Sequence, residues 1–346
     1  MYETFSFIII LFMHLKFNLT KYILAWYDNK KRILPWRVGK NSPNRLYYRI
    51  LSEFMLQQTQ VKTVIPYFVK FTRTFKNLNS LSNSSEKKVL KLWEGLGYYR
   101  RARNLLITSK ILINKYNSKL PKDINEIKTL PGVGEYTANV LAALIHNKAT
   151  IAIDGNVKRL FTRILNKSEN EIDFQKFINT NKKNLLNTNR NSDVVEALME
   201  FGALICKPKE PCCSICPIKK NCKFEKSEKK LILTKKNLIN EELNVFCYLN
   251  KNGKIALTKK NKVGFLNKFN LPQIEKKLES KRSFKKWKLL KKYRNSISNK
   301  KLNINLYYQF SKRIPVDYNW YSIKNNNEFI PSFTKKIFRQ VSTLFQ

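Results

Sequence analysis

Two carboxylates stand in segments where an acidic side chain could take part in a reaction. Glu53 lies in LSEFMLQQTQV (51–61) among leucine, phenylalanine and methionine, so it is either on the polar face of an amphipathic helix or partly buried with a raised pKa. A carboxyl that keeps its proton near neutral pH is what a general acid needs. Asp154 follows the apolar run of IAIDGNVKR (151–159), so it either caps the following helix or acts on a ligand that Gly155 lets approach.

A glycine-rich turn in LPGVGEYTANVLAAL (130–144) could hold an anion. Pro131 restricts one backbone dihedral angle, and Gly132 and Gly134 permit the positive φ of a tight turn. We expect helices over 123–130 and 135–145, which gives a helix–hairpin–helix. Unpaired N–H groups at the start of the second helix favour a phosphate, with no reading of base sequence. An ordinary turn between two helices is the alternative interpretation.

Five of the six cysteines lie between residues 206 and 222, with the spacing Cys206-x6-Cys213-x2-Cys216-x5-Cys222. Four thiolates so close together can enclose a [4Fe–4S] cluster or a tetrahedral zinc ion, and generic chemistry does not choose between them. The 6-2-5 spacing is unlike the paired CxxC pattern of zinc sites. Such local clustering favours a structural metal site in a reducing compartment over a disulfide framework. Cys212 is a fifth thiol beside this set.

The formal net charge of +43, from 67 Lys and Arg against 24 Asp and Glu, indicates a polyanionic partner, and nucleic acid is the default. Lysine and asparagine are frequent throughout the chain, so many individual lysines are expected only to be solvated. The apolar run at 5–13 is too short to span a bilayer and lacks the preceding basic residues of a signal peptide. We therefore expect translation to begin at Met13 and no membrane association.

The elements that position these residues fall into two domains. After an N-terminal extension (1–17), we expect a mainly helical domain over 18–225 because apolar residues recur at spacings of three and four. A charged linker over 226–242 leads to a smaller α+β domain over 243–346.

Within the smaller domain, alternating apolar and polar residues predict strands over 244–250, 254–260 and 302–310. The segments 283–293 and 332–345 are predicted as basic amphipathic helices.

The order of the motifs carries a resemblance to a known superfamily. The chain resembles the helix–hairpin–helix base-excision glycosylases of the endonuclease III superfamily in five segments. In chain order these are LSEFMLQQTQV, GLGYYRRARNL (95–105), LPGVGEYTANV, IAIDGNVKR and the 6-2-5 cysteine loop. The match covers roughly residues 20–225. Bifunctional members carry a Schiff-base lysine where this chain has Tyr136, and LPWR (34–37) and DGNVKR add to the similarity with the MutY-type adenine DNA glycosylases.

The resemblance implies a monofunctional hydrolase of N-glycosyl bonds in base excision repair. Its expected substrate is double-stranded DNA, from which it removes adenine mispaired with 8-oxoguanine or guanine after flipping the base outward. The implied protein is a monomer, cytoplasmic and nucleoid-associated, of bacterial type.

Roles for single residues follow from the resemblance alone. Glu53 is expected to protonate N7 of adenine, and Asp154 to stabilise the oxocarbenium-like sugar, with Tyr136 and Asn156 supporting the two carboxylates by hydrogen bonds. The other implied sites are the adenine pocket (Trp36, Arg37, Leu56, Glu196), the wedge in the base stack (Gln58, Tyr98), the DNA backbone contacts (Gly132, Gly134, Lys158) and one [4Fe–4S] cluster on Cys206, Cys213, Cys216 and Cys222.

The C-terminal domain is more loosely similar to the Nudix-like lesion-recognition domain of these enzymes. GFLNKFNLPQ (264–273) has Leu266 where tryptophan is usual, and Ser298 and Asn299 stand where serine and histidine are usual. The absence of the histidine bears on how strongly 8-oxoguanine is distinguished from guanine. The Nudix hydrolase signature is absent, so we expect no pyrophosphatase activity.

Three alternatives stay open at the level of sequence. The C-terminal domain could be a basic accessory DNA-binding domain. The whole chain could be an endonuclease III-like pyrimidine glycosylase and lyase, or a non-enzymatic DNA-binding protein that carries a cluster.

Overall fold

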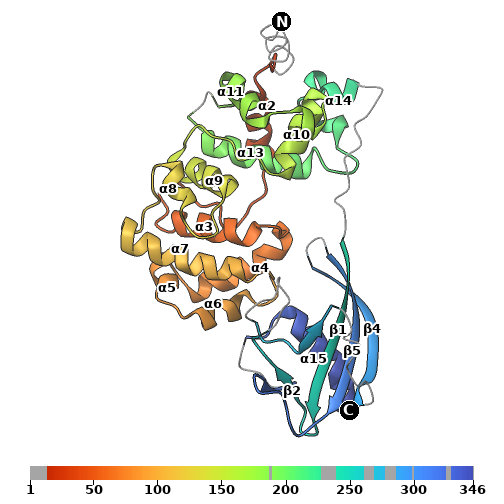
Figure 1. Ribbon diagram of the computed structural model, residues 1–346. Coiled ribbons are helices and arrows are strands. Elements are labelled where there is room, and N and C mark those ends of the chain that lie inside the picture. The colour runs from red at the N-terminus through yellow and green to blue at the C-terminus, as the bar shows by residue number, and fades with distance from the viewer. Residues whose placement is uncertain are drawn as a thin grey trace, which may run out of the picture. The chain divides into compact units, whose positions relative to one another are not determined.

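The computed structural model describes residues 14–186, 189–226, 239–260, 269–276, 286–297, 300–324 and 329–345. Its contacts divide the chain into two compact units, one of residues 1–84 and 100–233 and the other of residues 85–99 and 234–346 (Figure 1). The stretch 85–99, which we expected inside the helical domain, is thus grouped with the C-terminal unit. The apolar run at 5–13 and Met13 lie outside the described residues.

The described part of the first unit contains helices joined by loops and turns, and no strand. Its α-helices are α2 (Leu19–Lys30), α3 (Arg45–Leu56), α4 (Val61–Thr74), α5 (Leu78–Ser82), α7 (Arg100–Tyr116), α8 (Ile124–Lys128), α9 (Glu135–His146), α10 (Gly155–Leu165), α11 (Phe174–Thr180), α12 (Lys182–Leu185), α13 (Asn191–Leu204) and α14 (Lys223–Lys226). Helices α2, α10 and α13 bury one apolar cluster that includes Ile23, Phe161 and Phe201. Each such side chain contributes about 1.5–3 kcal/mol when fully buried.

The hairpin between α8 and α9 has the predicted form. Asp123 caps α8 by accepting a hydrogen bond from the Asn125 N–H, and α9 begins at Glu135. Gly132 has φ +81°, a conformation that favours glycine. The expected positive φ at Gly134 was wrong. The chain reverses at Gly132, and Gly134 is the N-cap of α9 with an extended backbone and φ −86°.

The second unit is built around a six-stranded mixed sheet with the order β4-β5-β1-β2-β6, in which β3 also pairs with β1. The strands are β1 (Ile239–Asn250), β2 (Lys254–Leu257), β3 (Gln273–Glu275), β4 (Lys288–Ile297), β5 (Lys300–Phe310) and β6 (Asn319–Ser322), with helices α6 (Glu86–Trp93) and α15 (Ser332–Val341). Strands β1 and β5 are parallel, and the other pairs are antiparallel.

The predicted helix over 283–293 was wrong for its described part, because residues 288–293 belong to β4. This strand pairs antiparallel with β5 along its length, and that pairing overrides the helical pattern of KLLKKY. Lysines are common on edge strands because their charge discourages pairing with another chain. The predicted helix over 332–345 is α15, continued by a short 3-10 turn.

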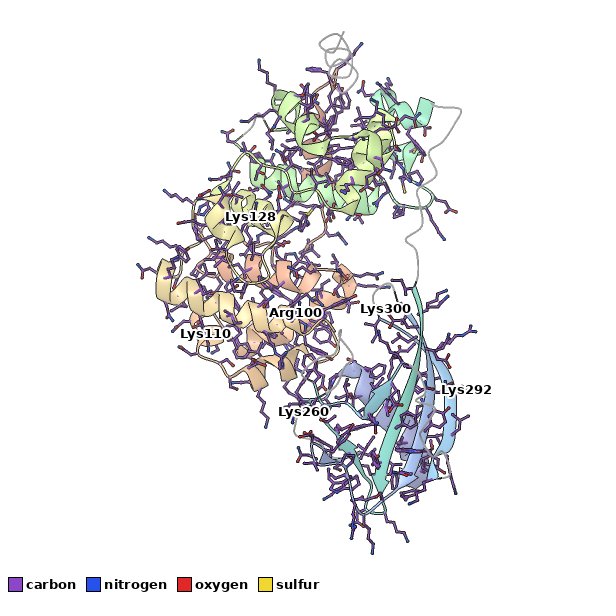
Figure 2. The ribbon with its side chains drawn as sticks, in the orientation of Figure 1. Arg100, Lys110, Lys128, Lys260, Lys292 and Lys300 are labelled. Atoms are coloured by element: carbon purple, nitrogen blue, oxygen red, sulfur yellow. The ribbon has the colours of Figure 1, made fainter. Side chains whose placement is uncertain are left out.

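Basic side chains come from both units. Figure 2 labels Arg100 and Lys110 on α7, Lys128 on α8, Lys260 after β2, Lys292 on β4 and Lys300 on β5. Lys260 pairs with Asp317 at 2.7 Å, and Lys300 pairs with Glu241, whereas Lys110, Lys128 and Lys292 are exposed. Among the described helices, none has the length and apolar character needed to cross a membrane.

Candidate active site

A cavity of about 860 Å³ in the first unit brings together residues that lie far apart in the sequence. Its walls include Glu53 on α3, Tyr136 on α9, and Asp154 and Asn156 at the start of α10. Helix α3 packs against α9, and α9 and α10 both pack against α13, so four helices fix these side chains (Figure 1). The two carboxylates singled out in the sequence therefore face one cavity.

Glu53 is buried, with 8% of its surface exposed. Burial raises the pKa of its carboxyl to about 7; Arg49 opposes this shift, while Glu196 and Asp154 add to it. At neutral pH such a group is protonated in about half of the molecules. Glu53 can therefore donate a proton to a bound base under ordinary conditions.

Asp154 caps α10 and lines the cavity at the same time. Its Oδ1 accepts hydrogen bonds from the backbone N–H groups of Asn156 (2.9 Å) and Val157 (2.7 Å), and its Oδ2 accepts one from Asn156 Nδ2 (2.8 Å). These three donors and the positive end of the helix stabilise a negative charge there. The two interpretations that the sequence offered for Asp154 are thus compatible.

Asn156 is fixed from two sides. Arg159 Nη2 donates a hydrogen bond to its Oδ1 at 2.8 Å. Gly202 of α13 lies so close that a Cβ at that position would be 2.7 Å from Asn156 Cβ and 2.9 Å from its carbonyl oxygen. The start of α10 therefore rests directly on α13, which sets the position of Asp154.

Tyr136 borders the cavity with a neutral hydroxyl. Burial raises the pKa of this phenol far above its ordinary value, and the charges of Glu53 and Asp154 add to the effect. The hydroxyl lies 3.1 Å from Met199 Sδ, to which it donates a hydrogen bond. The position can supply a hydrogen bond, but it has no amine to attack a sugar carbon.

A buried ion-pair network forms another wall. Glu196 of α13 accepts hydrogen bonds from Arg49 Nη1 (2.6 Å), Arg37 Nε (3.0 Å) and the Tyr27 hydroxyl (3.0 Å). Although burial opposes ionisation, Arg49 and Arg37 hold the pKa of Glu196 below its usual range. Glu196 is therefore an ionised acceptor held in place by three donors.

Glu200, one helical turn after Glu196, holds two arginines. It accepts from Arg32 Nε (2.7 Å), Arg32 Nη2 (2.8 Å) and Arg37 Nη2 (3.0 Å). Burial opposes ionisation here too, but the hydrogen bonds from Arg32 and the charge of Arg37 lower the pKa of Glu200 to about 2. Arg37 is thereby fixed between two carboxylates.

Sequence reasoning missed Arg32, Arg49 and Glu200. A signal was present for two of them, because Arg49 precedes Glu53 by four residues and Glu200 follows Glu196 by four. Residues four apart share one face of a helix, so a polar pair in an apolar helix indicates a polar wall. Arg32 stands in a non-helical segment and had no such signal.

The remaining predicted pocket residues also line the cavity. Trp36 is buried, with its ring edge-on to Phe68 at a centroid distance of 5.3 Å, and Leu56 is half-buried at the end of α3. Gln58 is exposed at the cavity and has φ 56°, which is uncommon for a residue other than glycine.

Four of the residues predicted to contact DNA do not line the cavity: Gly132, Gly134, Lys158 and Tyr98. Gly132 and Gly134 lie in the hairpin, and Lys158 Nζ pairs with Glu169 Oε1 at 2.5 Å. Tyr98 belongs to the second unit, is 40% exposed and has φ 48°. Ser298 and Asn299 lie outside the described residues, as does Leu266.

The cysteines of the 206–222 loop line a separate small cavity beside α10 and α13. Five free thiols line this cavity, those of Cys206, Cys212, Cys213, Cys216 and Cys222. Arg163 Nη1 donates to Cys206 Sγ at 3.3 Å and to the Lys207 carbonyl at 2.6 Å, which ties the loop to α10. Within the part of the chain that the structure describes, no three His, Cys, Asp or Glu side chains are arranged to hold a metal ion.

Comparisons with known proteins identify a family. Residues 51–183 match the family described as the HhH-GPD superfamily of base excision DNA repair proteins. A protein of Buchnera aphidicola subsp. Baizongia pistaciae, named adenine DNA glycosylase, is 34% identical over 321 residues, which cover 88% of this chain and 90% of that protein. The mouse protein of the same name is 36% identical over 208 residues, 58% of this chain and 40% of its own length.

A likeness to a solved structure bears on the fold alone. A thermostable thymine-DNA glycosylase superposes with a TM-score of 0.51 at 24% identity and covers 60% of this chain and 94% of its own.

Proposed function

This chain belongs to the adenine DNA glycosylases of the helix–hairpin–helix superfamily, and from that premise we propose the chemistry that its residues perform. The enzyme is a hydrolase of base excision repair that removes adenine by breaking an N-glycosyl bond. The single observation that carries the proposed mechanism is that Glu53, with its pKa raised to about 7, and Asp154 line one cavity.

Glu53 acts as the general acid in this proposal. It transfers its proton to N7 of an adenine that has left the duplex and entered the cavity. The proton withdraws electrons from the base, so that the C1′–N9 bond breaks with the bonding electrons going to adenine. The apolar setting of Glu53 supports this role because it keeps the carboxyl protonated near pH 7.

Asp154 stabilises the positive charge that develops on the sugar. Its carboxylate is held by three hydrogen bonds at the start of α10, so it does not have to reorganise as the charge forms. Water then adds at C1′, its proton passes to the Glu53 carboxylate that the first step left, and an abasic site remains. Asn156 supports Asp154 through the hydrogen bond to its Oδ2. The expected hydrogen bond from Tyr136 to a carboxylate is not made, because its hydroxyl donates to Met199 Sδ, and Tyr136 instead borders the same cavity.

Tyr136 supports a monofunctional reaction. A lyase needs an amine that forms a Schiff base with the sugar, and the neutral phenol of Tyr136 cannot form one. The same observation argues against the alternative of a pyrimidine glycosylase and lyase.

The adenine pocket in this proposal is formed by four side chains, those of Arg37, Glu196, Trp36 and Leu56. The ionised Glu196 is an acceptor suited to the exocyclic amino group, and the aromatic and aliphatic side chains suit the faces of the base. Gln58 fills the space that the base leaves in the stack, which its exposed position at the cavity supports. Tyr98, Gly132, Gly134 and Lys158 remain proposed DNA contacts.

We also propose that the C-terminal unit is Nudix-like and recognises the base opposite the adenine, 8-oxoguanine or guanine. Its mixed sheet, with the parallel pair β1 and β5, supports that assignment, as does helix α15, whose Lys336 Nζ donates to Asn295 Oδ1 of β4 at 2.7 Å. Ser298 is the residue of this unit to which we assign a contact with the lesion.

Cys206, Cys213, Cys216 and Cys222 would hold a [4Fe–4S] cluster. The four thiols suit such a group by their chemistry, because iron–sulfur clusters are held by cysteine thiolates, and all four line one small cavity, although the described side chains are not arranged around a metal ion. The cluster would crosslink the 206–222 loop to itself. Arg163 and Arg159 already tie the loop to α10 through the backbone carbonyls of Lys207 and Cys206.

The proposal is tested by single-turnover excision on four duplexes that carry adenine opposite 8-oxoguanine, guanine, cytosine or thymine. We expect release of adenine, fastest opposite 8-oxoguanine, and a strand that stays intact until alkali is added. Strand cleavage without alkali, with a product trapped by borohydride, would contradict the monofunctional mechanism. A lack of any adenine release would contradict the proposed function as a whole.

A further inference from the structure

The short reversal that follows α3, residues 57–60, holds Gln58 in a left-handed conformation with φ 56°. This conformation is strained for a residue other than glycine, and it persists only where the surrounding structure holds it. A buried arginine on α7, which the proposed function does not use, donates hydrogen bonds on both sides of Gln58.

Arg101 reaches the reversal from the first turn of α7. Its side chain is buried, with 7% exposure. Nη1 lies within hydrogen-bond distance of three carbonyl oxygens, those of Phe54 (3.1 Å), Met55 (2.8 Å) and Gln57, and of Thr59 Oγ1 (3.2 Å). Its two N–H groups are shared among these acceptors. The guanidinium thus satisfies carbonyl groups at the end of α3 that have no partner within the helix, and its charge suits the negative end of the helix.

The same face of α7 also fixes the DNA-binding hairpin. Thr108, seven residues after Arg101, donates its hydroxyl to the Pro131 carbonyl at 3.0 Å. Between them, Asn104 packs under Gly132, where a Cβ would come within 2.8 Å of Asn104 Cβ. Gln57 Nε2 closes the arrangement by donating to the Gly132 carbonyl at 3.2 Å. One helix face therefore holds both the reversal with Gln58 and the hairpin.

We propose that Arg101 is a positioning residue that fixes Gln58 relative to the hairpin, so that Gln58 enters the base stack as the adenine leaves it. The inference rests on the proposed function. Arg101 touches no reacting atom and acts through Gln58. Its removal should impair extrusion of the base, since a misplacement of about 1 Å in a positioned group can cost about a hundredfold in rate.

A double-mutant cycle in the full-length protein tests this inference. Arg101→Met and Gln58→Ala should each slow single-turnover excision from the duplex with adenine opposite 8-oxoguanine by about tenfold or more. The double variant should be within about threefold of the slower single variant, because both changes remove one function. Losses that multiply to about a hundredfold would overturn the proposal, since the two residues would then act independently.

A second substrate separates positioning from a general loss of structure. An adenine in a single-base bulge is already unpaired, so its extrusion costs less. Arg101→Met should lose far less activity on the bulge than on the paired duplex, and Arg101→Lys should recover part of the loss, because an ammonium group can still donate to the carbonyls. Equal losses on both substrates would contradict the proposed role.

Controls keep the test decisive. Arg190→Met removes the ion pairs with Asp28 and Asp193 elsewhere in the first unit and should leave excision unchanged whatever it does to thermal unfolding. If Arg101→Met does not fold, Thr59→Val removes one acceptor of Arg101 and should show the same coupling to Gln58→Ala in a weaker form. Multiplying losses for Thr59→Val would overturn the proposal equally. A wild-type protein that releases no adenine would instead refute the proposed function.

Discussion

At the scale of single residues, the site is defined by two carboxylates in opposite surroundings. Glu53 is buried near other acids, and this raises the pKa of its carboxyl to about 7. Asp154 has three hydrogen-bond donors and a helix N-terminus, which stabilise its charge. The two environments differ in the way that the proposed mechanism needs, with proton transfer from Glu53 to the base and positive charge developing on the sugar beside Asp154.

The raised pKa of Glu53 predicts the pH dependence of the reaction. In the proposed mechanism the protonated form is the active acid. Its folded-state pKa lies above the ordinary value of 4.5, so this form is fully present at pH 5 and is lost as the pH rises through about 7. The single-turnover rate should therefore fall about tenfold per pH unit above that point. A rate that rises steadily from pH 6 to pH 8.5 on a duplex bound at saturation would contradict the assignment.

At the scale of elements, α13 is the helix on which the site is built. It provides Glu196 and Glu200 to the cavity, places Met199 against Tyr136, and lets the start of α10 approach at Gly202. The position of the Asp154 carboxylate therefore depends on the packing of α10 against α13 at Gly202.

A substitution at Gly202 isolates this contact. Gly202→Ala puts a Cβ within 2.7 Å of Asn156 Cβ and 2.9 Å of its backbone oxygen, so α10 must shift. We expect a loss of about 1–3 kcal/mol in the free energy of unfolding, together with a fall in the excision rate. Gly39→Ala, where a Cβ meets no atom within 4 Å, is the matched control and should leave both unchanged. Wild-type excision by Gly202→Ala would show that this contact does not set Asp154.

The cysteine loop is a second element with a measurable consequence. Cys213→Ser and Cys216→Ser should each remove the visible absorbance of an iron–sulfur centre, whereas Cys247→Ser, at a buried thiol of the second unit, should not. Retention of the absorbance by both loop variants, or its loss in Cys247→Ser, would contradict the proposed ligand set.

Much of the fold and site could be predicted from the sequence, and the failures have identifiable causes. The hairpin and the cap at Asp154 were predictable because local residue types dictate them, as Pro131, Gly132 and Asp154 do. The strand at 288–293 was missed because pairing with β5 decides it, and that partner is distant in sequence. Arg32 and Arg101 were missed because the carboxylate and carbonyl groups that hold these arginines are brought to them only by the fold.

At the scale of the whole molecule, charge governs the encounter with DNA. The net charge of +43 is distributed over both units, and exposed lysines such as Lys110, Lys128 and Lys292 occur in each part of the fold. Some lysines are used internally, as the pairs Lys260–Asp317 and Lys300–Glu241 show. The field of the whole protein should therefore attract duplex DNA of any sequence, while the cavity selects the base.

This division predicts a strong dependence of binding on salt. Each neutralised phosphate releases counterions, so about six or more contacts would lower the affinity for duplex by about a thousandfold between about 50 and 200 mM salt. The slope should be nearly the same for a mispaired and a fully paired duplex, measured by fluorescence anisotropy. An affinity that does not change over this range would contradict the electrostatic account.

The most direct test of the central claim, that Glu53 is the buried acid of the reaction, combines binding and release on one molecule. Glu53→Gln preserves the size of the side chain and removes its acidic proton, and Glu171→Gln, at an exposed carboxylate in the same unit, is the control. With a duplex carrying adenine opposite 8-oxoguanine, Glu53→Gln should bind like the wild type but release adenine at least about a hundredfold more slowly. Adenine release by Glu53→Gln at the wild-type rate would contradict the account.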